Sequence, residues 1–141
     1  MYLAVPAIAQ RLSDVLGPGW AVGHGNAPQG RMRVPRADVR LIGAAMQDAK
    51  GRAVSLQARY QIALVVASGH GDAAFEVLES AITTVIAALH QWPPHPQKSP
   101  ATRLELLAIG ESAIPSAEVF GYDLAFGMTV IRHGFDPHQP T

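Results

Sequence analysis

Six histidines are the residues of this sequence best suited to binding a metal ion, because neutral imidazole is a common ligand. No two of them form the i, i+4 pair around a glutamate that zinc peptidases place on one helical face. Most stand beside glycine or proline, in segments expected to be loops. The spacing therefore predicts solvated side chains, with neither a metal site nor a cofactor, at His24, His70, His90, His95, His133 and His138.

A serine, a histidine and an aspartate stand close together in residues 68–72, which read Ser-Gly-His-Gly-Asp. Members of a catalytic triad usually converge from separate elements, so this spacing favours a turn, with Asp72 capping the helix that follows. No Gly-x-Ser-x-Gly motif is present, and the glycines of residues 17–30 lack the Lys-Ser/Thr pair of a phosphate-binding loop. We expect no enzymatic activity; a small enzyme or ligand-binding domain using His24 or His70 is the alternative.

Arginine is concentrated between residues 31 and 40. Guanidinium groups bind carboxylates and phosphates well, so these side chains could face a neighbouring subunit or line a pore through which DNA passes. Solvated surface arginines on a loop are the other interpretation. Arg59 stands between Gln57 and Gln61, which indicates that this strand face is wet or meets a polar partner. The candidate subunit-interface or pore-facing residues are Arg31, Arg33, Arg36, Arg40, Lys50, Arg52 and Arg59.

The composition indicates a globular chain whose exterior is partly covered by partners. Of the 141 residues, 48% are hydrophobic and only 16% are charged, which is too apolar for a disordered chain. The 11 basic and 11 acidic residues cancel, which disfavours direct DNA binding as the main role. Cysteine is absent, so disulfides and a thiol nucleophile are excluded.

The domain organisation predicted from the sequence is simple. The N-terminus lacks the basic start of a secretory signal, and no apolar run reaches the roughly 20 residues needed to cross a bilayer. We expect a soluble protein with a single domain over residues 1–134 and a flexible C-terminal tail over residues 135–141.

The first half of the chain predicts a helix followed by a hairpin. Apolar side chains recur every three or four positions over residues 3–16, which is typical of an amphipathic helix. A short strand and a long irregular loop are expected over residues 20–36. Two extended runs, residues 38–47 and 53–68, are joined by a polar turn, and apolar and polar side chains alternate along the second run.

The second half predicts a long helix and another hairpin. The helix follows Asp72, and its apolar stripe starts at Phe75. Prolines between residues 92 and 100 end it and predict a stiff exposed linker. Residues 103–109 and 118–132 are the expected strands of the second hairpin. The fold class is therefore α+β: a mainly antiparallel sheet of two hairpins, with an N-terminal helix and a long central helix packed on one face.

Two stretches resemble a known family in their order and length. The first is the strand ARYQIALVVAS leading into the helix DAAFEVLESAITTVIAAL, and the second is RLELLAIGESAIPSAEVFGYDLAFGMTVI, a strand, a turn and a closing strand. Together with the N-terminal helix they resemble the phage tail terminator proteins, of the lambda minor tail protein U type and of Mu-like prophages. The resemblance covers most of the chain, but residues 30–40 and 92–100 have no counterpart in the family pattern.

The resemblance implies a structural virion protein of the bacteriophage tail or neck, assembled in the host cytoplasm. Such a subunit forms a homohexameric ring that caps the tail tube and joins it to the neck or head. The implied partners are other copies of itself, the tail tube protein and a neck or head-completion protein, with passing contact to DNA in the lumen and no membrane. The family has no catalytic residues and no cofactor. Another neck or head-completion protein, acting in head–tail joining, is the alternative.

Overall fold

The structure is a computed structural model, and it describes residues 3–24, 33–95, 102–112 and 119–133. The proposed domain boundary at residue 134 and the expected tail lie outside the described residues. The described elements follow one another as α1 (Ala4–Leu16), β1 (Ala21–His24), β2 (Arg36–Lys50), β3 (Ala53–Ala67), the short 3-10 helix η1 (Ser68–His70), α2 (Asp72–Leu89), β4 (Glu105–Glu111) and β5 (Val119–His133).

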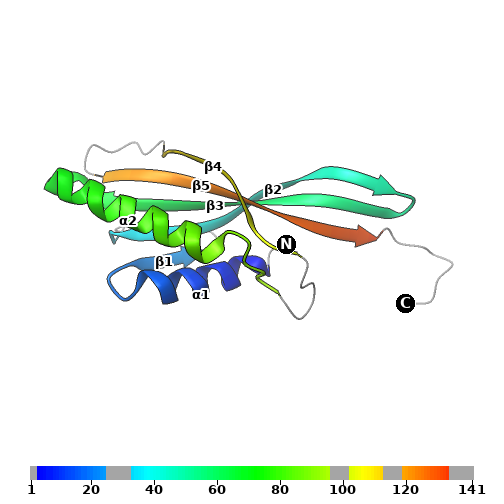
Figure 1. Cartoon of the computed structure of the whole chain (residues 1–141), viewed down its shortest axis with the longest axis horizontal. Coiled ribbons are helices and arrows are strands. Elements are labelled where there is room, and N and C mark those ends of the chain that lie inside the picture. The colour runs from blue at the N-terminus through cyan, green and yellow to red at the C-terminus, as the bar shows by residue number, and fades with distance from the viewer. Residues whose placement is uncertain (1–2, 25–32, 96–101, 113–118, 134–141) are drawn as a thin grey trace.

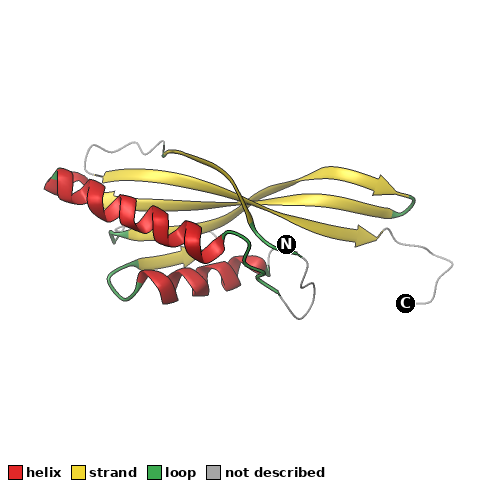
Figure 2. Ribbon diagram, in the orientation of Figure 1, coloured by secondary structure: helices red, strands yellow, loops and turns green. Residues whose placement is uncertain are grey.

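The described strands form one five-stranded sheet, in the order β1-β2-β3-β5-β4. The consecutive strands β2 and β3, and likewise β4 and β5, pair antiparallel, and the β3–β5 pair joins the two hairpins. Both helices lie on the same face of this sheet (Figure 1, Figure 2). The predicted α+β fold is thereby confirmed. The short β1 adds a parallel pair with β2, which the sequence did not indicate.

Helix α1 presents one apolar side to the sheet, as its periodicity predicted. Pro6 is accommodated because it lies in the first turn, where a missing N–H costs no helical hydrogen bond. Gly17 ends the helix with a φ of 84°, a conformation that side chains with a Cβ rarely adopt. The buried residues of α1 are Ala4, Val5, Ile8, Ala9 and Leu12.

The β2–β3 hairpin is longer, and its turn tighter, than the sequence predicted. Lys50 pairs with Ala53, so only Gly51 and Arg52 form the turn. Gly51 has a φ of 58°, as the first central residue of a type II′ turn requires. Two register shifts mark bulges in β2, which increase the local twist of that strand. The hairpin therefore continues as paired sheet almost to its tip.

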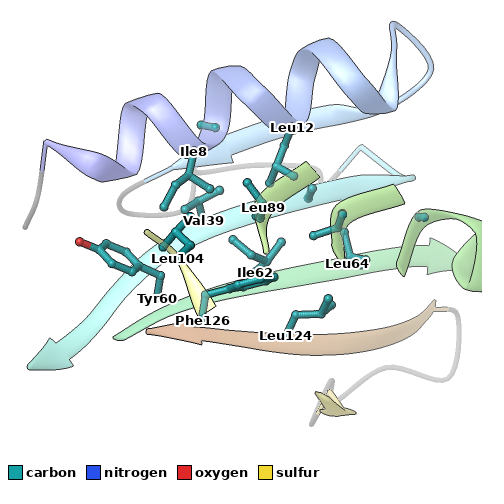
Figure 3. Packing of buried hydrophobic residues seen from close by; sticks show 14 of the residues in the cluster. Ile8, Leu12, Val39, Tyr60, Ile62, Leu64, Leu89, Leu104, Leu124 and Phe126 are labelled. Atoms are coloured by element: carbon teal, nitrogen blue, oxygen red, sulfur yellow. The ribbon is translucent and has the colours of Figure 1, made fainter. Parts of the chain in front are cut away.

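Alternate side chains of β3 and β5 point into one hydrophobic core beneath the helices (Figure 3). Tyr60 pairs with Phe126, and Ile62 pairs with Leu124. All four are fully buried, as is Ile8 of α1. Burying one large apolar side chain stabilises the fold by about 1.5–3 kcal/mol, so this layer provides much of the driving force. The alternation of apolar and polar residues along these strands therefore results from the burial of every second side chain in the core.

The expectation of an exposed linker after α2 is wrong for residues 92–95. Trp92 is half-buried and packs against the core. Its carbonyl accepts a hydrogen bond of 3.0 Å from the N–H of Leu104, and the Arg11 guanidinium lies 5.1 Å from its ring centre. The helix stops before the prolines, as predicted, but the indole has enough apolar area to pack this segment against the core. Residues 96–100 lie outside the described residues.

The phenol of Tyr60 is expected to make stability fall at alkaline pH. Burial raises the pKa of Tyr60 from 10.0 to about 12, although the positive charge of Arg132 acts in the opposite direction. The stabilisation from keeping this phenol neutral is complete below pH 10, the ordinary value, and is lost as the pH rises toward 12. We expect the free energy of unfolding to fall by about 2–3 kcal/mol more over this interval than in Tyr60→Phe. Urea denaturation at several pH values measures this, and parallel pH profiles would contradict it.

Candidate functional site

Three strands continue beyond the helices as a projecting ribbon (Figure 1). We call residues 43–57 and 128–133 the arm. In the described chain, β1 pairs with β2 only as far as Val39, and β4 pairs with β5 only as far as Gly127. Among residues 33–95 and 119–133, the two outer strands of the arm therefore have no neighbouring strand to pair with the N–H and C=O groups along their outer edges. Such edges attract other chains unless something covers them.

The arm also carries an apolar row on the face that the helices cover elsewhere. Met46 pairs with Leu56, and Leu56 pairs with Val130, so the three side chains lie next to one another across the strands. Met46 is 68% exposed, while Leu56 and Val130 are half-buried. On the opposite face, Ile131 is 61% exposed. The alternation of apolar residues that forms the core therefore continues along the arm, beyond the part of the sheet that α1 and α2 cover.

Arg36, one of the candidate interface residues, is engaged within the chain. Its Nε and Nη2 donate hydrogen bonds of 2.6 Å to the two carboxylate oxygens of Asp38, and this pairing raises the pKa of the guanidinium. Only 7% of Arg36 is exposed. Gly23 lies against the pair, and a Cβ there would stand 2.7 Å from atoms of both residues. A side chain at position 23 would therefore force the pair to shift, and glycine in β1 leaves room for it.

The remaining basic candidates are spread over the sheet. Arg40 and Arg59 are exposed on the face opposite the helices, and the Nε of Arg59 donates to the Oε1 of Gln57 at 3.2 Å. Lys50 and Arg52 are exposed at the tip of the arm. The candidates do not converge on one patch. Arg33 is exposed before β2, and Arg31 lies outside the described residues.

The Ser-Gly-His-Gly-Asp segment is a turn, as predicted. Ser68 to His70 form η1, and Gly71 follows with a φ of 57°. The expectation that Asp72 caps α2 is wrong, because Gly71 holds the N-cap position and Asp72 is already helical, with no side-chain cap. Gly71 takes that position because its backbone lies in a region that L side chains rarely adopt.

The histidines are scattered over the chain. His24 is exposed at the end of β1, and the Nδ1 of His90 accepts a hydrogen bond of 3.1 Å from the N–H of Leu106. The Nε2 of His95 is buried without a partner. His70 and His133 lie in η1 and β5, and His138 is outside the described residues. Within the described ranges, no three His, Cys, Asp or Glu residues are placed to hold a metal ion.

A groove of about 550 Å³ lies between α1 and α2. Val15, Leu16 and Trp20 line one side, and Glu76, Val77 and Ser80 line the other. Glu76 is its single titratable lining residue, so the groove holds no acid–base pair. A lining of both polar and apolar surface, with one carboxylate, suits docking of a side chain or strand better than bond-making chemistry. Neither α1 nor α2 has the length and apolarity of a segment that crosses a bilayer.

The fold is shared with a known virion component. A solved chain from "Virion of native gene transfer agent (GTA) particle" is similar to this protein with a TM-score of 0.58 and 17% sequence identity. The match covers 92% of this chain and 94% of that one. At this identity the similarity concerns the fold. Comparison with family models finds no match, and comparison with curated proteins finds none either.

Sequence reasoning missed the arm, although a signal for it was present. β3 contains 15 residues and α2 contains 18. At about 3.3 Å per strand residue and 1.5 Å per helical residue, β3 spans about 50 Å and α2 about 27 Å. One helix laid along the sheet therefore leaves part of the alternating pattern uncovered. That mismatch in length predicts an exposed apolar end.

Proposed function

We propose that this protein is a structural virion protein, the tail terminator subunit that forms a ring on the end of the tail tube and joins it to the neck or head. The observation that carries the proposal is the arm, whose apolar row and unpaired strand edges need a partner. The fold common to this chain and a gene transfer agent virion chain, over nearly the full length of both, supports it.

The described surfaces favour assembly over catalysis. The groove between the helices contains one titratable residue, Glu76, and no base beside it to activate a nucleophile. The apolar row of the arm, by contrast, is a surface that association would remove from water. Closed homo-oligomers cover such surfaces by repeating one contact around an axis. A homohexamer fits the proposed role at the tube end.

The open sheet face gives the ring a polar surface. Arg40 and Arg59 lie on it, together with Gln61, whose Nε2 donates to the Oδ2 of Asp123 at 2.8 Å. If this face lines the lumen, the two arginines are the groups that meet passing DNA phosphates. A subunit contact through the same arginines is the other arrangement, and the neutral chain allows both.

Native mass spectrometry with negative-stain imaging tests the proposal. We expect a ring of about 90 kDa, six copies of the 15.0 kDa chain, that binds the ends of isolated tail tubes. Tube protein and the neck or head-completion protein should both bind the ring, on opposite sides. A chain that stays monomeric at every concentration and ignores tube ends would contradict the proposal. Binding only to the head side would instead identify a head-completion protein.

A further inference from the structure

Charge is divided between two distant parts of the molecule. The arm carries three basic residues, Lys50, Arg52 and Arg132, against one acidic residue, Asp48. Helix α2 contains no lysine or arginine, and its acidic residues Asp72, Glu76 and Glu79 are all exposed. The net charge of the chain is zero, but the arm is basic and helix α2 is acidic.

The helix dipole accounts for only one of the three acidic residues of α2. Carboxylates are stabilised near a helix N-terminus, but this effect fades within the first turn, which holds only Asp72. Spacings of four and three residues place Asp72, Glu76 and Glu79 along one side of the helix, where like charges repel one another. Glu76 also lines the groove between α1 and α2. The acidic stripe therefore meets the groove at Glu76, beside the apolar side chain of Val77.

The arm and the groove cannot meet within one chain. The arm projects from one end of the long axis, while the first turns of α2 and the end of α1 lie at the other end (Figure 1). Two complementary surfaces at opposite ends of a molecule form a head-to-tail contact between copies. Such a contact closes into a ring when the rotation between copies permits.

We propose that the arm of one copy docks into the α1–α2 groove of the next copy. The row of Met46, Leu56 and Val130 then packs against Val77 and the other apolar residues of the groove. Arg132 pairs with Val54, which shares the strand face of Leu56, so Arg132 approaches the carboxylate of Glu76. A second copy is the occupant because this one chain supplies both the arm, with its apolar row and Arg132, and the groove that contains Glu76. The inference rests on the proposed ring and specifies the contact that closes it.

A charge-swap experiment on the full chain tests the docking. The arm variant is Arg132→Glu, and the groove variant is Glu76→Lys. Both side chains are exposed, so each variant should keep the native circular dichroism spectrum and urea midpoint. Each variant alone brings like charges together and should need at least ten-fold more protein for half-assembly. An equimolar mixture pairs opposite charges at every contact and should again form rings, with the two variants in equal amounts.

Glu105→Lys is the matched control, because it changes the net charge as the groove variant does, at an exposed position of β4. Rings should persist in it. Equal loss of rings in the control, or a mixture that stays unassembled, would overturn the docking. If the native chain and both variants form rings equally well, the docking is wrong while the ring stands. If the native chain forms none, both proposals are wrong.

Discussion

Met46→Asp is expected to abolish ring assembly while leaving the subunit folded. Met46 is 68% exposed in the single chain, so the substitution should change its free energy of unfolding by no more than about 0.5 kcal/mol. In the proposed contact the new carboxylate would be buried against Val77, close to the negative Glu76. Burying an unpaired charge costs several kcal/mol, and each 1.4 kcal/mol is a factor of ten in affinity. The apparent dissociation constant should rise by at least about a hundred-fold, measured by native mass spectrometry across a dilution series.

Ile131→Asp is the control for this experiment. Ile131 lies on the same arm and is 61% exposed, but it pairs with Ser55 and faces away from the row that contains Met46. It adds the same charge and removes a side chain of similar size. Assembly should therefore survive in Ile131→Asp. If both variants lost assembly to the same degree, the helix-side face of the arm would not be the contact, and overall charge or edge pairing would explain the loss.

The elements that the sequence predicted well are those whose pattern has a local cause. In β3 and β5 every second residue enters the core, so burial imposes a period of two that is visible without any partner strand. The α1 stripe and its stop at Gly17 are equally local. Phe75 shows the limit of this reasoning, because it belongs to the apolar stripe of α2 by spacing but is 48% exposed, stacked on Phe120 near the end of the sheet.

Features that depend on distant segments could not be predicted in this way. The parallel pairing of β1 with β2, and the packing of Trp92 on the core, both need contacts between residues far apart in the chain. The sequence pattern predicts a strand from residue 38, which places Arg36 in the preceding loop. The strand begins at Arg36, which places Arg36 and Asp38 two residues apart on one face. Opposite charges at that spacing in a strand indicate an internal pair.

The candidate interaction surface illustrates the same division. The sequence named basic residues, and two of them, Lys50 and Arg52, lie at the tip of the arm. It did not indicate that the tip stands clear of the helices, because how far a sheet is covered depends on how the helices are laid across it. Glu76 belongs to the helix that the sequence predicts after Asp72, but its place in the lining of the groove depends on how α1 and α2 pack together.

Phe126→Ala is expected to cost more stability than any surface change in this chain. Phe126 is fully buried. It pairs with Tyr60 of β3 on one side and with Leu106 of β4 on the other, so its side chain lies between residues of two neighbouring strands. Replacing such a ring leaves a cavity and costs about 3–5 kcal/mol, out of the roughly 5–15 kcal/mol that hold a typical domain together. The urea midpoint should therefore fall sharply, with the slope of the transition unchanged.

Phe75→Ala removes the same ring from the stripe of α2 and is the matched comparison. The Phe75 ring is 48% exposed, and its stacking on Phe120, with ring centres 4.8 Å apart, is worth about 0.5–1.5 kcal/mol beyond area burial. Its midpoint should shift by less than half as much as that of Phe126→Ala. Equal shifts would mean that the first turns of α2, rather than the β3–β5 layer, hold the fold together. The arm is made of the same strands as that layer, so a weakened core should also loosen the arm's attachment and lower ring yield in Phe126→Ala but not in Phe75→Ala.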